Sequence, residues 1–182
     1  MSQLGWKAAF GSPEGLARLG VGHPIAAALP DDGLVETGAT VSIAGWTKPV
    51  IEIEVAIWIG RGLGAAIELA DVEFPPDDVE RVIATGVYHR NVVLGPPRVQ
   101  TLDGATARAL CDGAEIAFTD DLLALTGTHE TVLAVCREAA GRELRDGEVV
   151  IAGSVFPPFP LEPGQRWHAD LGPLGALSLA IA

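Results

Sequence analysis

Cysteine is scarce in this sequence of 182 residues, which contains only Cys111 and Cys136. Two cysteines are too few for a disulfide framework, and their spacing lacks the paired pattern of a zinc site. A reducing compartment is the simpler interpretation. The sequence also lacks an apolar run near the roughly 20 residues that cross a bilayer, and its N-terminus lacks the pattern of a signal peptide. We therefore expect a cytoplasmic protein that neither crosses a membrane nor is exported.

Basic residues are few as well. The 12 Lys and Arg residues are outnumbered by 24 Asp and Glu residues, which gives a formal net charge of -12. The basic residues are scattered singly, and the closest group, in residues 137–145, is interleaved with acids. A surface of this charge repels phosphate backbones and anionic lipid headgroups unless a basic patch offsets it. Neither nucleic acid nor a membrane surface is therefore expected as a partner.

Glycine and proline, with 22 and 13 residues, divide the sequence into short segments that are typical of strands. Two helices are predicted, one over residues 79–84 and one that begins at the cap residue Thr128 and ends at Gly141. No repeat, low-complexity tract or linker is found, so the pattern predicts an α+β fold dominated by strands and a single domain over residues 1–182. The predicted strands cover residues 39–43, 50–59, 148–152, 166–169 and 176–181.

Two glutamates lie two residues apart in the strand predicted over residues 50–59. Alternate side chains of a strand share a face, so Glu52 and Glu54 project together, about 7 Å apart. Two carboxylates placed in this way can converge on one hard cation. The alternative is a solvated strand face, the commoner origin of a Glu-x-Glu pattern. The apolar residues around the pair argue against it, because buried like charges are costly unless a cation or hydrogen bonds offset them.

A third acid is needed for a carboxylate site that leaves coordination positions open to substrate, as Mg²⁺ or Mn²⁺ chemistry requires. Glu68 is the candidate, because it is a conspicuous lone acid in the apolar residues 65–70. The alternative for Glu68 is a surface position on a short helix. Lys7 lies in a short, mostly apolar segment, although spacing alone favours a solvated surface lysine.

Five segments, taken in order, resemble the 2-keto-4-pentenoate hydratase and 4-oxalocrotonate decarboxylase branch of the fumarylacetoacetase superfamily. Pro49 to Ala56 is similar to the Pro-x-Val-Glu-x-Glu-Ile-Ala metal strand of that family, and Ala66 to Asp71 resembles the segment that brings the third carboxylate. His23 replaces the usual Glu or Gln of another segment. The five segments fall within residues 5–13, 19–25, 49–56, 66–71 and 144–165.

The resemblance implies a mixed β-roll of the fumarylacetoacetase C-terminal-domain type, with an octahedral Mg²⁺ or Mn²⁺ bound by Glu52, Glu54 and Glu68. In such enzymes a 2-oxo acid chelates the metal, which stabilises the enolate formed as a proton moves along the carbon skeleton. Lys7 matches the family lysine, which would bind the substrate carboxylate or assist proton transfer, and Ser12 would help to orient the substrate. The family also implies a homodimer or a higher homo-oligomer.

The sequence departs from the family pattern in its first part. The match to the family begins almost at the lysine segment. We therefore expect the helical N-terminal portion of the hydratases to be missing, together with the part of the pocket wall that it forms. The stretch between the metal strand and Glu68 is shortened to residues 60–64. This shortening leaves open whether Glu68 reaches the cation.

A third departure lies in residues 83–95, where Tyr88 and His89 replace small polar groups that line the active site of relatives. A histidine there can act as a general acid or base together with Tyr88, and Arg90 can clamp a second carboxylate. A satisfied surface pair is the alternative for His89 and Arg90. Ser154, in the closing segment, is a further candidate for substrate binding.

Three functional hypotheses follow. The first is a lyase of the hydratase or decarboxylase type, which uses Mg²⁺ or Mn²⁺ and acts on a 2-oxo acid or its enol. The second is a biosynthetic tailoring enzyme (a dehydratase, isomerase or cyclase) that acts on a larger intermediate. Such an enzyme could work without a metal, with His89, Tyr88 and Lys7 performing acid–base chemistry. The third is a non-catalytic family member that binds an active partner subunit.

Overall fold

Strands form most of the regular structure in the computed structural model, which describes residues 3–122 and 128–182. Two mixed sheets with a few short helices confirm the predicted α+β class. The helices are α1 (Pro13–Leu19), α2 (Val79–Ala84), α3 (His129–Ala140) and the 3₁₀ turn η1 (Gly172–Leu174). The strands are β1 (Gln3–Ala9), β2 (Ile25–Pro30), β3 (Leu34–Val35), β4 (Thr40–Val41), β5 (Pro49–Trp58), β6 (Gly62–Asp71), β7 (His89–Leu94), β8 (Ala107–Cys111), β9 (Ala114–Thr119), β10 (Val149–Ser154), β11 (Phe159–Pro160), β12 (Arg166–Asp170) and β13 (Ala176–Ile181).

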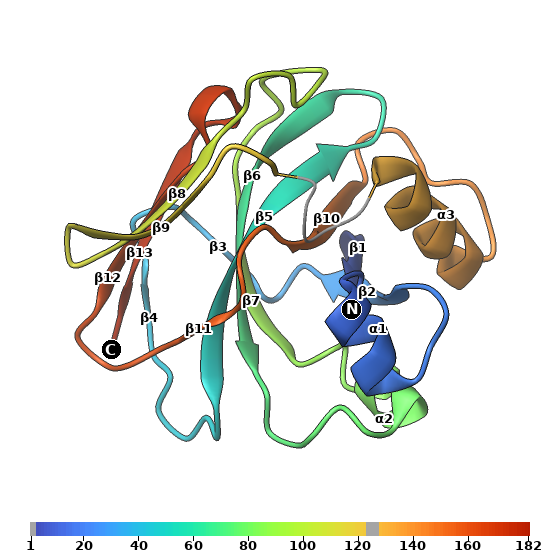
Figure 1. Ribbon diagram of the computed structural model, residues 1–182, viewed down its shortest axis with the longest axis horizontal. Helices are drawn as coiled ribbons and strands as arrows, with labels where there is room; N and C mark the ends of the chain where they lie inside the picture. The colour runs from blue at the N-terminus through green and yellow to red at the C-terminus, as the bar shows by residue number, and fades with distance from the viewer. Residues whose placement is uncertain (1–2, 123–127) are drawn as a thin grey trace.

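The larger sheet has eight strands and runs through the centre of the molecule (Figure 1). Its order is β2-β1-β10-β5-β6-β7-β3, and β11 adds to one end of β5. β10 lies between β1, to which it is parallel, and β5, to which it is antiparallel. A glycine is required where β1 meets β10, because a Cβ atom on Gly5 would lie 1.8 Å from the carbonyl oxygen of Val149. The sheet therefore joins strands that are far apart in the sequence.

The second sheet has five strands in the order β4-β13-β12-β8-β9 and forms a separate layer to the left of the larger sheet in Figure 1. Its inward side chains, such as Trp167 and Leu179, belong to the same hydrophobic cluster as Ile53 and Ile67 of the larger sheet. The five-stranded sheet thus covers one face of β5 and β6. The proposal of a single domain over residues 1–182 agrees with this shared cluster and remains a prediction.

The three α-helices lie on the other side of the larger sheet (Figure 1). The two predicted helices are confirmed: α2 covers residues 79–84, and α3 has Thr128 as its N-cap and Gly141 as its left-handed C-cap. Helix α1 was not predicted, although its signals are present in the sequence. Ser12 caps it by accepting a hydrogen bond from the backbone of Gly15, a proline follows at the first position, and a glycine ends it.

The predicted strands are recovered with shifts at their ends. The strand expected over residues 50–59 is β5, which begins and ends one residue earlier, and the strand expected over residues 176–181 is β13. The strand expected over residues 39–43 was predicted too long, because only Thr40 and Val41 pair with β13. Within the described residues, no helix has the length and apolar character needed to span a membrane.

Candidate metal centre

The hairpin of β5 and β6 brings the three predicted metal ligands together. The two strands pair antiparallel over ten residues, and this register places Glu52 directly opposite Glu68, with Glu54 two residues further along. One carboxylate oxygen from each residue lies within 4.8 Å of the other two. The shortened connection over residues 60–64 therefore leaves Glu68 within reach of its partners.

Burial of these carboxylates excludes the surface alternatives. Glu68 lies in a strand, not on a short helix, and is 0% exposed, while Glu54 is 1% exposed. Glu52 is half-buried, because one side of it faces a pocket. A solvated strand face does not describe this arrangement. Three acids packed this closely need compensation for the water that they have lost.

Hydrogen bonds satisfy only part of this requirement. The Lys7 ammonium donates to Oε1 of Glu68 at 2.5 Å, and Nδ1 of His89 lies 2.7 Å from the same oxygen. Because an ionised carboxylate only accepts, we assign the donated proton to Nδ1 of His89. The backbone N–H of Gly153 donates to Oε2 of Glu54 at 3.0 Å. Oε2 of Glu68 is buried and has no hydrogen-bond partner among the described residues.

The pKa values of these residues also indicate that the burial of the carboxylates is only partly compensated. Burial, followed by the charge of Glu68, raises the pKa of Glu52 to about 7 and also raises the pKa of Glu54. Burial opposes ionisation of Glu68 as well, but the charge of Lys7 and the hydrogen bond from His89 lower the Glu68 pKa. Burial disfavours the charged form of Lys7, yet the surrounding carboxylates raise its pKa.

Charge balance gives a direct test of whether these residues fit a divalent cation. Three ionised carboxylates and one ammonium leave two negative charges, which a divalent ion would neutralise. Oxygen ligands of this kind suit hard ions such as Mg²⁺ and Mn²⁺. The unpartnered oxygen of Glu68 also gains a partner if an ion binds. The residues present therefore fit such an ion, with Glu52, Glu54 and Glu68 as its ligands.

A pocket of about 590 Å³ opens beside the carboxylates. Its lining includes Glu52 and Glu54 and the predicted site residues Ser12, Tyr88 and Ser154. Lys7 and His89 are not part of the described lining; both are buried and contact Glu68. The structure therefore places the predicted residues in two groups, one along the pocket and one around Glu68.

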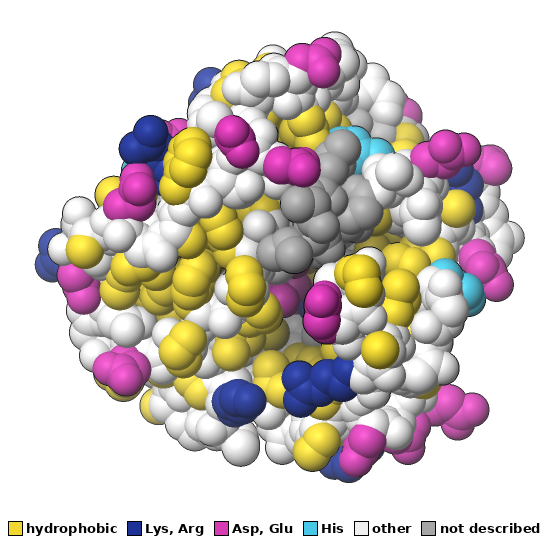
Figure 2. Space-filling model, viewed as in Figure 1, with side chains coloured by type: hydrophobic (Ala, Val, Ile, Leu, Met, Phe, Trp, Pro, Cys, Tyr) yellow, Lys and Arg dark blue, Asp and Glu magenta, His cyan; other side chains and the backbone are white. Residues whose placement is uncertain are grey.

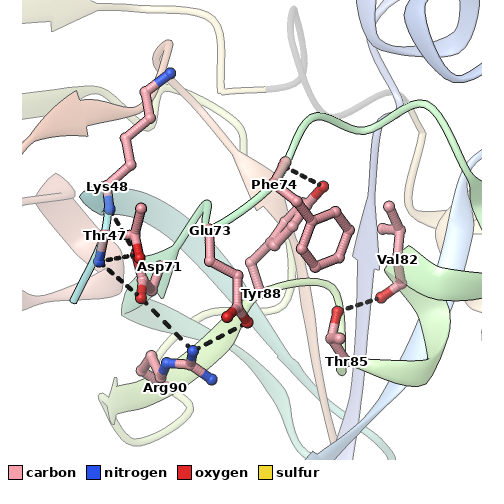
Figure 3. A network of polar contacts seen from close by, with 9 residues as sticks. All are labelled: Thr47, Lys48, Asp71, Glu73, Phe74, Val82, Thr85, Tyr88 and Arg90. Carbon is pink, nitrogen blue, oxygen red and sulfur yellow. Dashed lines mark hydrogen bonds and ion pairs between the residues drawn. The ribbon is translucent and has the colours of Figure 1, made fainter. Parts of the chain in front are cut away.

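Arg90 belongs to neither group. Its guanidinium pairs with Glu73 at 3.2 Å and with Asp71 at 3.6 Å, and Asp71 also accepts hydrogen bonds from the backbone of Thr47 and Lys48 (Figure 3). These contacts tie the start of β5 to the end of β6. Arg90 lies outside the described pocket lining, which argues against a role in substrate binding. That role remains a prediction.

Tyr88 and the two serines line the pocket, but their hydroxyl groups are already bonded to the protein. The Tyr88 hydroxyl donates to the carbonyl of Phe74 at 3.1 Å (Figure 3). The Ser12 hydroxyl caps α1, and the Ser154 hydroxyl donates to the carbonyl of Ile53 at 3.4 Å. Catalytic roles for Ser12 and Tyr88 remain predictions: Ser12 keeps its proton free to donate, whereas Tyr88 would have to release the Phe74 carbonyl before it could donate.

Two backbone groups at the site could not be found from residue types. The N–H of Gly153 holds Glu54, and the carbonyl of Val87 accepts a hydrogen bond from Lys7 at 3.0 Å. Val87 and Tyr88 both have positive φ angles, 55° and 64°, which is an unfavourable backbone conformation for non-glycine residues. The only sequence signal near them is Gly86, which indicates a turn. The strained turn directs the Val87 carbonyl to Lys7.

Comparison with known proteins agrees with this geometry. No protein-family model matches the chain. The chain is similar to a 4-oxalocrotonate decarboxylase of Pseudomonas sp, with 25% identity over 203 residues that cover 98% of this chain and 78% of the relative. A second match is the structure of 4-oxalocrotonate decarboxylase from Pseudomonas putida G7 complexed with magnesium and adipate. That structure has a TM-score of 0.84 and 19% identity, over 100% of this chain and 78% of the other.

Another solved structure with this fold is fumarylpyruvate hydrolase from Pseudomonas aeruginosa in complex with Mn²⁺ and pyruvate. It has a TM-score of 0.73 and 16% identity, over 97% of this chain and 88% of the other. The chain therefore has the fold of the fumarylacetoacetase superfamily, and the resemblance inferred from its sequence segments is confirmed. In sequence the chain resembles 4-oxalocrotonate decarboxylase, at 25% identity.

Proposed function

We propose that the protein is a divalent-metal-dependent enzyme that acts on a 2-oxo acid or its enol. The observation that carries this proposal is the buried cluster of Glu52, Glu54 and Glu68, in which one Glu68 oxygen has no partner among the described residues. The cluster opens to a pocket large enough for a small molecule. Support comes from the similar proteins, which are named as a decarboxylase and a hydrolase and have structures with magnesium or Mn²⁺.

A bound Mg²⁺ or Mn²⁺ would supply positive charge that stabilises negative charge developing on a substrate oxygen. The chain's own residues prepare the site for that chemistry. Lys7 and His89 hold Oε1 of Glu68 and leave Oε2 without a hydrogen bond among the described residues. The Gly153 N–H fixes Glu54 in the same way. Ligands held by such bonds need little rearrangement when they bind.

The finer assignment is a lyase of the hydratase or decarboxylase type. Both reactions pass through an enolate of the 2-oxo acid, so the same carboxylate centre serves either of them. The name of the similar Pseudomonas protein, a decarboxylase, favours the lyase class over hydrolysis. We also propose a homodimer, from the family resemblance, and size-exclusion chromatography with light scattering measures that state directly.

Metal titration tests the proposed function. Isothermal titration of the metal-free protein with Mn²⁺ should show one strong site per chain, and the Glu52→Gln variant should lose most of that affinity. Glu115→Gln is the matched control, because Glu115 is an exposed residue of the five-stranded sheet. The proposal is wrong if the unaltered protein takes up neither Mn²⁺ nor Mg²⁺ in excess. With metal bound, release of CO₂ or loss of dienol absorbance from unsaturated 2-oxo acids distinguishes decarboxylation from hydration.

A further inference from the structure

Resting on the proposed function, we propose a substrate class for this site. The geometry points to a 2-oxo acid whose carbon skeleton carries a large uncharged apolar group, such as an aromatic ring, in place of a second carboxylate. The polar end of such a molecule faces Glu52 and Glu54, and its apolar end fills the remainder of the pocket. The size, the wall and the charges of the pocket each support this class.

The pocket volume exceeds what a short-chain acid needs. At about 590 Å³ it lies inside the range of roughly 300–1,000 Å³ that holds drug-sized ligands. Glu52 and Glu54 of β5 are the lining residues that would face the metal and the polar group of the substrate. A compact 2-oxo acid beside these carboxylates would leave most of the volume to water, whereas a ring-bearing acid would displace more of the water.

The wall offers apolar surface and few free polar side chains. The hydroxyls of Ser154 and Tyr88 donate their protons to backbone carbonyls, whereas the Ser12 hydroxyl accepts from the Gly15 backbone and keeps its proton. A hydrogen-bonded hydroxyl that must release its partner gives little net gain when it binds a ligand. The apolar side chains that line the pocket include Phe10, Val50, Val72, Val132, Phe156 and Pro158.

Charged groups in the lining do not favour a second carboxylate. Apart from Glu52 and Glu54, the charged side chains of the described lining are Glu14 and Arg18. Both are exposed, and they lie four residues apart on α1 with opposite charges. Arg90, the other candidate clamp, is engaged by Asp71 and Glu73. A carboxylate carried into this wall would lose water without a buried cation to compensate.

The surface around α1 and the segment before β11 agrees with this description. In Figure 2 hydrophobic side chains gather left of the centre of this face, and toward α1 they lie among acidic and basic groups. Apolar surface near a concave site is typical of a place where ligands bind.

Competition binding to the Mn²⁺-loaded protein tests the inference, with three 2-oxo acids as probes. Phenylpyruvate carries a ring, 2-oxoglutarate a second carboxylate, and pyruvate neither. The Mn²⁺ electron paramagnetic resonance spectrum reports binding of the 2-oxo carboxylate group that all three acids share. We expect phenylpyruvate to bind roughly tenfold or more tightly than pyruvate, because its ring buries apolar surface, and 2-oxoglutarate to gain nothing.

The Val72→Arg variant sharpens the test, because it adds a cation to the apolar wall at a half-buried position. It should shift the preference in favour of 2-oxoglutarate, because only that acid brings a second carboxylate to the new cation. The Val72→Leu variant is the control and should keep the preference for phenylpyruvate. Tight 2-oxoglutarate binding to the unaltered protein that disappears in Arg18→Gln would overturn the inference. Equal binding of all three acids would also overturn it.

The two proposals can fail separately in this experiment. If Mn²⁺ does not bind, the proposed function fails and the substrate inference fails with it. If Mn²⁺ and pyruvate bind but phenylpyruvate binds no better, the metal-dependent function stands and only the substrate class is wrong.

Discussion

The two sheets of this protein differ in what they bury. Among the described residues, the larger sheet contains all the buried lysine, histidine and acidic side chains, namely Lys7, Glu54, Glu68, Asp71 and His89. In the five-stranded sheet the charged side chains of β8 and β12 are exposed or half-buried, and β13 alternates between buried apolar and more exposed positions. One sheet is arranged for chemistry, whereas the other supplies apolar support behind it.

This difference shows where the fold gives up stability. Buried charges stabilise a protein only when their partners are complete, and an incomplete set costs free energy. Strands β5 and β6 carry the incomplete set on one face and the shared hydrophobic cluster on the other. The apolar face, covered by the five-stranded sheet, can therefore offset the cost of the carboxylate face. Four experiments test this contrast.

The largest effect is expected from loss of the buried ammonium. Lys7→Met leaves Glu68 without its cation, and breaking a buried ion pair costs roughly 3–5 kcal/mol. Urea unfolding in the presence of a chelator measures this loss. Lys48→Met is the control, because Lys48 is exposed, and it should change the free energy of unfolding by less than about 0.5 kcal/mol. Equal effects of the two substitutions would contradict the contrast between the sheets.

The second prediction concerns pH in the metal-free protein. Glu52 has a pKa of about 7 in the folded state against 4.5 as its ordinary value, so between these values the folded state binds more protons than the unfolded state. The free energy of unfolding should therefore fall as pH rises from 5 to 8, by on the order of 2 kcal/mol. Thermal unfolding at several pH values measures the slope.

Two changes should reduce that slope. Glu52→Gln removes the titrating group, and saturating Mn²⁺ favours the ionised carboxylate, so either should flatten the pH dependence. A free energy of unfolding that rises over this pH range in the metal-free protein would contradict the burial of ionisable groups described for the larger sheet.

A smaller effect is expected for His89, which acts on the metal through Glu68 and is a positioning residue. His89→Leu removes the donor to Oε1 of Glu68 and should weaken Mn²⁺ binding about tenfold. His89→Asn keeps an N–H donor and should recover part of the affinity. Isothermal titration measures both variants. Identical Mn²⁺ affinities for the His89→Leu and His89→Asn variants would show that the hydrogen bond from His89 to Glu68 does not contribute to metal binding.

The smallest effect is expected in the five-stranded sheet. Arg108 pairs with Glu115 at 2.9 Å, but both side chains are about half exposed, at 53% and 44%. Arg108→Met should therefore change the free energy of unfolding by less than about 1 kcal/mol. Mn²⁺ affinity should stay the same. A loss as large as that of Lys7→Met would show that the second sheet also depends on its charges.

The sequence was informative wherever a residue type and a spacing together imply one geometry. Glu52 and Glu54 share a face because they are two apart on a strand, and Glu68 was found as an acid that an apolar segment does not explain. The same reasoning found α2 and α3 from their caps. Lys7 looked like a surface residue by its spacing, and only the family resemblance singled it out.

Other parts of the site depend on contacts that no local pattern encodes. The bond from Gly153 to Glu54 requires β10 to lie beside β5, and the contact of His89 with Glu68 requires the pairing of β6 with β7. Helix α1 was missed because seven residues show too little periodicity, although its capping residues were present. Long-range pairing therefore limited the prediction more than residue chemistry did.

The position of β10 has a consequence for how the protein is made. A ribosome completes β5 and β6 about eighty residues before it adds β10, yet β10 separates β1 from β5 in the finished sheet. Pairing between segments this far apart in the sequence is slow to form. The position between β1 and β5 must therefore stay open until β10 has been made. Gly153 arrives with β10, so Glu54 receives its backbone donor only late in synthesis. Metal loading of the finished site should therefore follow translation and not accompany it.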